Sequence, residues 1–467
     1  MINLQSEDVK RRVIKCMPWI LLYEFFQVFN ENVFNLITPN LSQEFGITPS
    51  TVSLIVTLGK LFLGIASIVF SALSDIVSTR KLMLASCFVL PVVTMIGFFS
   101  PHSFTLLITA RVLFALTIAI PLALQVVIAL KYFDRLTAAK YFGYNAAIFQ
   151  LASAAGHFFG GYITENLHWN YIFLFPLLTL IGVPTLIKNL PKDESKKGSF
   201  DFIGMILVTF ISTLLITFMT FKMQYPMLLI SAIVFIAIFA LYTIKSKNPF
   251  IKPELFKVKG IIWSLIVCGL FYGTQVGFGF IFPFIVSNAY GLPVSTIGVF
   301  YSLTNIAAFI AGMYSGRIIK AVGYRNIALL GGLFIFSGLT MVAFLVGYSV
   351  AFVFVGMGLF NIGYALFFSG YLTNYTQLLP EHQRGSGVGI ERLVLNVGSS
   401  LGGAFIAMLY GQPYMMNKIL DFSSNPKTAM YSNVALVLMV MIAAATFIFT
   451  RVFDKKLNRI EQTSSPE

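Results

Sequence analysis

The amino-acid sequence predicts an all-α polytopic membrane protein, and three observations support this fold class. Hydrophobic residues make up 57% of the chain and charged residues only 11%, against roughly 25% charged residues in soluble domains. The apolar residues gather in runs near the roughly 20 residues that a helix needs to cross a hydrocarbon core. Basic residues lie in the short segments between these runs, as in membrane proteins. This placement explains the net charge of +14 without any nucleic-acid partner.

The apolar runs predict fourteen transmembrane helices. These helices are expected at residues 18–35, 51–73, 82–99, 104–130, 138–163, 171–187, 202–220, 227–244, 261–286, 295–318, 327–346, 351–371, 388–410 and 432–450. The charged start of the chain is followed by an apolar stretch without a small-residue cleavage site, so we interpret that stretch as a retained first helix and not a signal peptide.

Basic residues alternate between the predicted loops and tails. One set of alternate segments holds 26 of the 32 Lys and Arg residues, the other holds Lys222, Lys418 and Lys427, and three lie inside helices. A miscounted helix would invert every later loop, so the alternation supports fourteen spans with both termini in the cytoplasm.

The sequence also contains an internal repeat of the form G-x-x-x-G-G. It occurs as Gly156, Gly160 and Gly161 in the fifth predicted helix and again from Gly398 to Gly403 in the thirteenth. Chance is one explanation, because small residues at this spacing are common in membrane helices. Removing helices seven and eight places both motifs in the fifth helix of a six-helix half, the parallel-repeat organisation of one large class of transporters. The predicted division is a cytoplasmic segment 1–16, a first half 17–189, a linker with two inserted helices 190–259, a second half 260–451 and a cytoplasmic tail 452–467.

Polar residues form a stripe on the first helix. Glu24, Gln27, Glu31 and Asn35 step by three, four and four residues, so they share one helix face. Lipid would not tolerate such a face, which is expected to line a cavity. Arg111 lies at a depth similar to that of Glu31, and a carboxylate beside a cation can bind and release protons. The alternative is a structural ion pair.

Other polar residues inside helices are candidates for substrate contact or gating. Lys60 is expected to pair with Glu31 or to reach the membrane surface, and His157 to be a helix-interface histidine or part of a proton path. Glu391 and Arg392 are interpreted as a local surface pair. The loop residues Asp75, Arg80 and Lys81 suggest a latch between helix ends. The candidate substrate cavity comprises Gln27, Asn35, Gln150, Tyr272, Gln275, Asn305, Asn361 and Tyr364, although interhelical hydrogen bonds explain such residues equally.

Enzymatic chemistry is not indicated. The four histidines do not pair at metal-ligand spacing, the three cysteines show no disulfide framework, and no nucleotide-binding loop or serine–histidine arrangement occurs. We expect no metal and no cofactor. A channel is not indicated either, because no ring of filter residues repeats.

At the level of motifs, the chain resembles the major facilitator superfamily, specifically its fourteen-helix drug:proton antiporters, and most of all the tetracycline efflux proteins of Gram-positive bacteria and their multidrug relatives. The segment Asn30-Glu31-Asn32-Val33 resembles the acidic motif of the first helix, which implies that Glu31 is the coupling carboxylate. Ser71 to Lys81 resembles the motif G-x-L-x-D-x-x-G-R-[RK], which implies a gating role for this loop. Arg111 resembles the fourth-helix arginine, and Gly156 to Gly161 the fifth-helix antiporter motif.

Some positions depart from the family patterns. His157 stands where the antiporter motif has proline, and Ser71 and Ser78 replace loop glycines. The resemblance implies a major facilitator fold of two six-helix halves plus two inserted helices. The expected function is proton-coupled efflux of amphipathic drugs, of tetracycline type or multidrug, by alternating access. Export of an endogenous fatty acid or metallophore, or proton-coupled import of a metabolite, are the alternatives. We expect a monomer in the bacterial cytoplasmic membrane that binds a small amphipathic substrate and protons or monovalent cations.

Overall fold

The computed structural model describes residues 2–74, 77–133, 135–191, 201–221, 223–246, 249, 253–379, 384–417 and 428–453, and these residues form helices and connecting turns without a strand. The first half contains α1 (Ile2–Leu36), α2 (Thr38–Glu44), α3 (Pro49–Val52), α4 (Leu54–Leu73), α5 (Thr79–Phe98), η1 (Ser100–His102), α6 (Phe104–Tyr132), α7 (Arg135–Asn166), the 3₁₀ segment η2 (Trp169–Gly182) and α8 (Val183–Asn189).

The remainder of the chain adds a helical hairpin and the second half. The hairpin is α9 (Phe202–Thr220) and α10 (Pro226–Lys245). The second half contains η3 (Pro253–Lys257), α11 (Ile261–Phe284), the π segment η4 (Ile285–Ala289), α12 (Val294–Leu345), α13 (Val350–Leu378), α14 (Arg384–Leu409), η6 (Pro413–Met415) and α15 (Ala429–Val452).

The fold class is confirmed, and the helices agree with fourteen spans. Among the described residues, 11 helices are long and apolar enough to cross a membrane. One of them, α12, has 52 residues and contains two spans that meet at Gly323, whose φ of 81° requires a residue without a side chain. The charged helices α1 and α7 supply the other two spans. The structure therefore gives one helix or helical segment for each predicted span.

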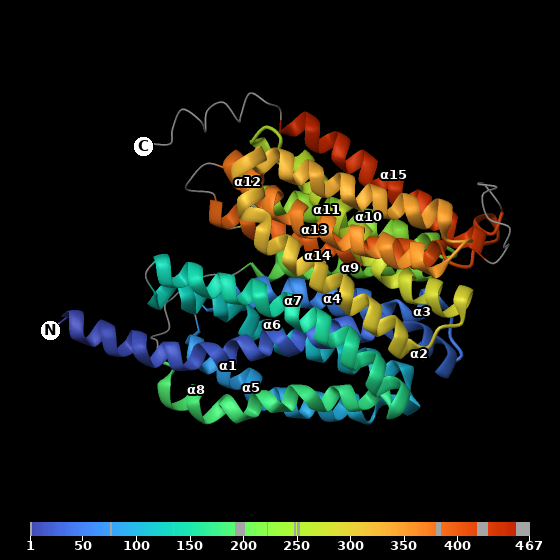
Figure 1. Ribbon diagram of the computed structural model, residues 1–467. Helices are drawn as coiled ribbons and strands as arrows, with labels where there is room; N and C mark the ends of the chain where they lie inside the picture. The colour runs from blue at the N-terminus through green and yellow to red at the C-terminus, as the bar shows by residue number, and fades with distance from the viewer. Residues whose placement is uncertain are drawn as a thin grey trace.

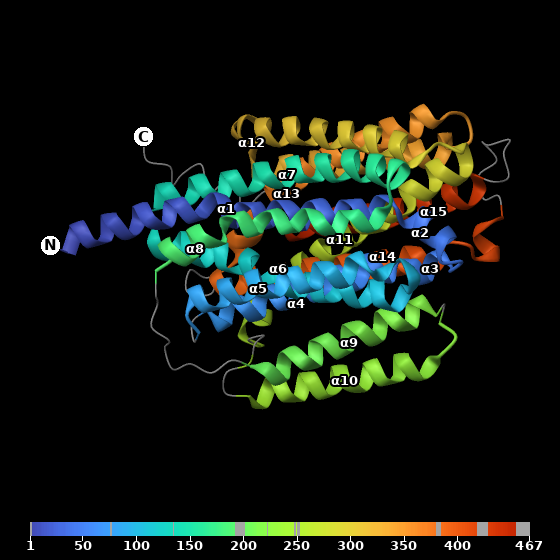
Figure 2. The same cartoon turned by 90° about the horizontal axis from the view of Figure 1, so that it is seen from below.

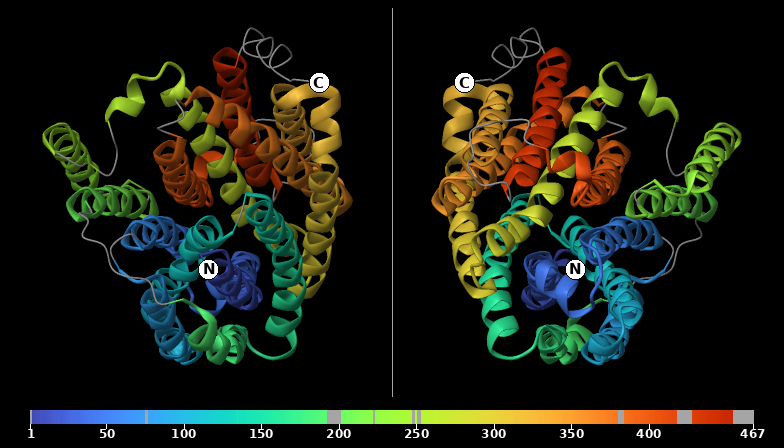
Figure 3. Two further views of the ribbon diagram at one scale, coloured as in Figure 1. Left: turned by 90° about the vertical axis from the view of Figure 1, so that its left-hand side faces the viewer. Right: turned by 90° about the vertical axis from the view of Figure 1, so that its right-hand side faces the viewer.

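The two halves lie side by side, and the chain ends share one end of the bundle. Figure 1 shows α1 beginning and α15 ending at the same end, which we call the terminal end; the opposite end is the distal end. Between the halves, α7 packs against α12 and α4 against α14. The hairpin of α9 and α10 lies beside α4 and α14, outside both halves (Figures 2 and 3). Its helix α10 is largely exposed, as a helix facing lipid would be.

The glycine repeat makes equivalent contacts in the two halves. A Cβ atom added to Gly156 would lie 2.7 Å from Phe29 O of α1, and one added to Gly398 would lie 2.7 Å from Gly269 Cα of α11. The first glycine of each motif thus packs on the first helix of its own half. Gly160 and Gly402, the second glycines, do the same with Val33 and Gly273.

The third glycines of the two motifs make different contacts. A Cβ on Gly161 would lie 2.7 Å from Val294 O of α12, in the opposite half. One on Gly403 would lie 2.9 Å from Val276 Cγ1 of α11, in its own half, and 3.2 Å from Thr57 Cγ2 of α4. The contacts of the two motifs therefore correspond at the first two glycines and differ at the third.

The two halves are held together at the distal end. Glu165, near the distal end of α7, accepts a hydrogen bond of 3.2 Å from the Ser295 backbone N–H at the start of α12. Gly298 packs directly against the His157 carbonyl group. Because α7 runs from the terminal end to the distal end, both contacts lie in the distal part of the bundle.

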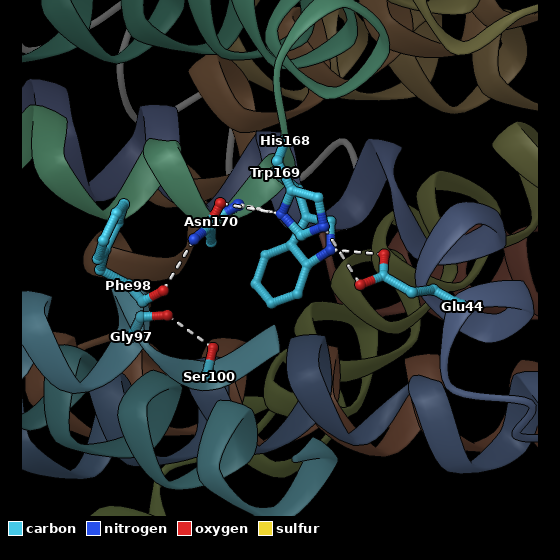
Figure 4. Close-up of polar contacts among 7 residues, drawn as sticks. All are labelled: Glu44, Gly97, Phe98, Ser100, His168, Trp169 and Asn170. Carbon is cyan, nitrogen blue, oxygen red and sulfur yellow. Dashed lines mark hydrogen bonds and ion pairs between the residues drawn. The ribbon is translucent and has the colours of Figure 1, made fainter. Parts of the chain in front are cut away.

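A polar network at the distal end fixes the short helix α2 (Figure 4). Glu44 accepts a hydrogen bond of 2.7 Å from Trp169 Nε1, and its other oxygen lies 3.4 Å from His168 Nε2. His168 Nδ1 lies 2.9 Å from Asn170 Oδ1, and Asn170 donates to Phe98 O at 2.8 Å. The network joins the ends of α2, α5 and η2.

At the terminal end, the first helix is longer than expected. The structure begins α1 at Ile2, so the helix includes the predicted cytoplasmic segment 1–16 instead of starting near Pro18. Glycine and proline are absent before Pro18, and Arg12 donates a hydrogen bond of 3.1 Å to Lys188 O at the end of α8. This contact supports the helical extension.

The predicted latch loop is described only in part, because Asp75 lies outside the described residues. Arg80 donates to Leu190 O at 3.2 Å and to Ile187 O. A cation there satisfies carbonyl groups left free at the end of α8. Lys81 is exposed. Arg80 therefore ties α5 to α8 within the first half, and the gating role stays a prediction.

The topology can be tested with reporter fusions. We expect fusions after Lys197 and after Lys259 both to report a cytoplasmic location and a fusion after Lys222 to report an external one, because basic residues remain on the cytoplasmic side. Opposite locations for the first two fusions would contradict the presence of two inserted spans.

The contact between the halves can be tested at Gly161. We expect Gly161→Val to lower the stability of the purified protein by about 1–3 kcal/mol, the usual cost of overpacking, because its side chain would meet the α12 backbone. The measurement is thermal unfolding in detergent. Gly316→Val is the matched control, since no atom lies within 4 Å of an added Cβ there. Equal stabilities of the two variants would contradict the role of Gly161.

Candidate functional site

The candidate site begins with an ion pair between the first two membrane helices. The Glu31 carboxylate of α1 pairs with the Lys60 ammonium group of α4. Gln27, one helical turn before Glu31, donates a hydrogen bond of 2.8 Å to the other carboxylate oxygen. The side chains of Glu31 and Lys60 are 20% and 21% exposed, so the pair is shielded by protein but still reachable by water.

Arg111 of α6 lies on the same side of α1. It donates a hydrogen bond to Asn30 Oδ1, and its guanidinium group lies 4.4 Å from the centre of the Phe34 ring. The side chain is buried, and its Nε atom has no hydrogen-bond partner. No ion pair with a carboxylate is found for it among the described residues. An amide and an aromatic face therefore take the place of a counter-ion.

The polar groups of α1, α4 and α6 converge on one pocket. The pocket is small and partly open, with a cavity volume of about 20 Å³, room for about one water molecule. It is lined by Gln27, Glu31, Gly59, Lys60, Leu63, Arg111, Phe114, Ala115 and Ile118. One carboxylate and two cations thus share a space with apolar walls. A carboxylate placed in this way can exchange a proton with water.

His157 makes its own set of contacts, in the interface between the halves. Its ring stacks on Tyr301 of α12 with centroids 3.7 Å apart. Its Nδ1 atom lies 2.8 Å from Ser153 O and 3.0 Å from Asn305 Nδ2, while Nε2 has no partner. None of these neighbours lines the pocket that contains Glu31. The contacts favour the helix-interface interpretation of His157.

Residues 20–403 match the model of the Major Facilitator Superfamily. The chain belongs to this superfamily.

Several characterised members are similar over nearly the whole chain. The riboflavin transporter RibZ of Clostridioides difficile is 24% identical, with 94% of this chain and 98% of that protein covered. The quinolone resistance protein NorB of Staphylococcus aureus is 22% identical, with 89% and 92% covered. Among solved structures, a bacterial homologue of the lysosomal transporter Spinster, in an inward-facing and unoccupied conformation, has a TM-score of 0.65 at 15% identity, with 95% and 97% covered.

Membership in this superfamily of transporters places the protein among membrane transporters and not among enzymes. All the residues that line the pocket belong to α1, α4 and α6 of the first half. The described residues contain no group of three or more His, Cys, Asp or Glu side chains that could hold a metal ion. The charged groups of the pocket are Glu31, Lys60 and Arg111.

The other predicted cavity residues are more dispersed. Asn361 of α13 donates to Thr304 Oγ1 at 2.9 Å, and Tyr364 donates to Phe271 O. Both bonds join different helices. Asn35 lies against Gly279 of α11, where an added Cβ would come within 3.0 Å of Asn35 Nδ2.

For the three remaining cavity candidates we describe only the degree of burial. Tyr272 is buried, whereas Gln150 and Gln275 are half-buried. None of the three is among the residues that line the pocket of Glu31. Their role as a substrate cavity stays a prediction.

Sequence analysis did not assign roles to three side chains that the structure brings into the site. Asn30 and Phe34 hold Arg111, and Tyr301 stacks on His157. A weak signal existed for Tyr301, which lies four residues before Asn305 and so on the same helix face. Asn30 precedes Glu31 by one residue. Because neighbouring residues of a helix point in different directions, the stripe that contains Glu31 did not indicate a role for Asn30.

The role of His157 can be tested by substitution. We expect His157→Asn to keep at least half of the wild-type transport rate and to leave its pH dependence unshifted, since the ring contacts Tyr301 and Ser153 and not the pocket. The measurement is transport in vesicles over a range of pH. A displaced pH profile at normal protein level would instead make His157 part of the proton path.

Proposed function

We propose that the protein is a proton-driven exporter of amphipathic drugs that works by alternating access. The observation that carries this proposal is the Glu31 carboxylate, which is paired with Lys60 on a pocket that also holds Arg111. In the ion pair, the charge of the carboxylate is balanced by that of the Lys60 ammonium group. A proton arriving from outside would neutralise Glu31 and release Lys60 from the ion pair.

The charges of the pocket link proton binding to release of the substrate. Neutralising Glu31 adds one positive charge to a space that already contains Lys60 and Arg111. A cationic or polarised ligand held near the carboxylate would lose its attraction and gain repulsion. The apolar walls, which include Leu63, Phe114 and Ile118, suit the non-polar part of such a ligand. Proton entry and drug exit would therefore share one site.

The distal contacts support alternating access. Glycines and the Glu165–Ser295 hydrogen bond hold the halves together at the distal end. These are short, local contacts, so they can break when the halves rock against each other. If the terminal end lies in the cytoplasm, as the topology prediction has it, these contacts would close the transporter toward the outside. NorB, a quinolone resistance protein, is similar over most of the chain and supports a drug as cargo.

Transport of a flavin-like heterocycle is the second candidate. It is favoured by the similarity to the riboflavin transporter RibZ over 94% of this chain. It also fits the replacement of the antiporter proline by His157. Two experiments separate the candidates. The first is a growth-inhibition panel in an efflux-deficient host with tetracycline, norfloxacin and ethidium. The second measures uptake of labelled riboflavin by an auxotrophic host. Resistance without uptake supports export, and uptake without resistance supports the flavin-like cargo.

The coupling role of Glu31 is testable with a probe from that panel. We expect Glu31→Gln to reduce transport driven by a pH gradient to the level of vesicles without the protein, because the amide cannot bind the proton. Ethidium movement in inverted vesicles is the measurement. Glu254→Gln, which makes the same change at an exposed carboxylate of η3, should transport normally. Wild-type rates for Glu31→Gln would remove Glu31 from the coupling role.

A further inference from the structure

A second carboxyl group is buried in the second half, far from the surface position expected for it. Glu391 lies in α14, seven residues after the helix begins at its terminal end. Its side chain has 0% exposure, whereas that of its neighbour Arg392 is 52% exposed. The interpretation of these two residues as a local surface pair is therefore wrong for Glu391. Adjacent residues of a helix point in different directions, so one faces the protein interior and the other faces water.

The surroundings of Glu391 do not stabilise a negative charge. Its Oε2 atom has no hydrogen-bond partner, and the Arg392 Nε atom lies 3.9 Å away, beyond hydrogen-bond distance. Its Oε1 atom is 3.7 Å from the Cys268 thiol sulfur of α11, a weak donor.

Phenol groups of α11 and α13 lie within electrostatic range of Glu391. They belong to Tyr272, Tyr371 and Tyr375. Tyr371 donates its hydroxyl hydrogen to Ser264 O at 2.9 Å and Tyr375 donates to Gly387 O at 2.8 Å. Their hydrogens are therefore directed to backbone carbonyl groups and not to the carboxyl group.

We propose that Glu391 is a second proton-binding site of the transporter and that it holds its proton in the conformation of this structure. An ionised carboxylate is strongly disfavoured inside a membrane protein when it is fully buried, accepts no hydrogen bond of normal strength and has its nearest described cation at 3.9 Å, the long end of ion-pair distance. The neutral acid fits the same space without that penalty. The bound proton sits on a carboxyl oxygen, and its loss to water leaves the carboxylate.

Arg392 supplies the means of releasing the proton. Its guanidinium group is half exposed and lies at the long end of ion-pair distance, so a small approach to Glu391 would strengthen the pair and favour the ionised carboxylate. Arg392 is also within electrostatic range of Glu24, a buried carboxyl group of α1 in the opposite half. The proposal assigns this one cation to both carboxyl groups in turn.

This sharing connects proton release to the movement of the halves. When α14 and α1 approach, Arg392 is drawn toward Glu24, and Glu391 keeps its proton. When they separate, Arg392 becomes available to Glu391, and the proton leaves. The use of this proton in transport rests on the proposed proton-driven function, whereas the occupancy of Glu391 by a proton does not.

Infrared difference spectroscopy of the full-length protein in lipid tests the occupancy directly. A protonated carboxyl group has a C=O stretching band separate from that of a carboxylate, and the band moves in heavy water. We expect this band in the wild-type protein near neutral pH and its loss in Glu391→Gln. Glu254→Gln is the matched control, because the Glu254 side chain is exposed to water and its replacement should leave the band unchanged.

Two further variants make the outcome decisive. Glu391→Asp keeps a carboxyl group and should shift the band, so it assigns the band even where the Gln variant fails to fold. Glu24→Gln removes the other buried carboxyl group named above and should leave the Glu391 band in place. A band that is equal in Glu24→Gln and in the double variant Glu24→Gln/Glu391→Gln, or that is unmoved in Glu391→Asp, would overturn the proposal, and so would a band that disappears completely in Glu24→Gln.

The spectrum of Glu31→Gln separates this inference from the proposed function. Its band should equal that of the wild-type protein, because Glu31 and Glu391 lie in different halves and make no direct contact among the described residues. Normal transport by Glu31→Gln would refute coupling at Glu31 while the band still decides the protonation of Glu391.

Discussion

The close approach of helices at glycine determines how the rest of the structure is arranged. Gly156 and Gly160 of α7 accept Phe29 and Val33 of α1, so this face of α1 is held against α7. Each residue of an α-helix is rotated by about 100° from the previous one. Glu31, two residues from both contacts, must therefore point about 200° away, toward α4 and α6. The ion pair with Lys60 and the pocket that contains Arg111 follow from this orientation. A bulkier residue at either glycine would turn or displace α1 and move the carboxylate with it.

The buried ionisable groups of the two halves differ in their interaction partners. In the first half, Glu31 and Lys60 neutralise each other beside a pocket, and Arg111 is supported by the Asn30 amide and the Phe34 ring. In the second half, Glu391 has no partner of comparable strength. The cost of removing a charge from water explains both arrangements, since a buried ion persists only with partners and otherwise becomes neutral. The two halves are thus similar in backbone packing but differ in the placement of their ionisable groups.

Periodicity and hydropathy predicted the fold well, because a helix in contact with lipid must be apolar along its length and this pattern is visible in the sequence. The helix at 202–220 was predicted with the bounds that the structure gives to α9, since a lipid-exposed helix is defined by its apolar residues alone. The extension of α1 to Ile2 and the short helix α2 were not predicted, because both lie where water replaces lipid and local contacts such as Glu44–Trp169 decide the structure. The stripe that contains Glu31 was visible from spacing, but the partner of Arg111 was not, because it depends on how two helices are rotated against each other. The burial of Glu391 was missed for the same reason: its charged neighbour Arg392 suggested a surface, and only the packing of α11, α13 and α14 removes it from water.

The asymmetry of the halves gives alternating access a physical basis. Contacts between the halves at the distal end are made by glycines, one hydrogen bond to a backbone N–H and the stacked rings of His157 and Tyr301. None of these contacts contains an ion pair, so separating them leaves no uncompensated buried charge. Toward the terminal end, by contrast, the buried carboxyl group of Glu24 is within electrostatic range of the half-exposed Arg392. Closing that end would desolvate this cation, which then needs a carboxylate to receive it. In the proposed proton-driven cycle, the stability of a closed terminal end would therefore depend on protonation, whereas packing holds the distal end closed. Such a difference would favour one direction of the proposed cycle.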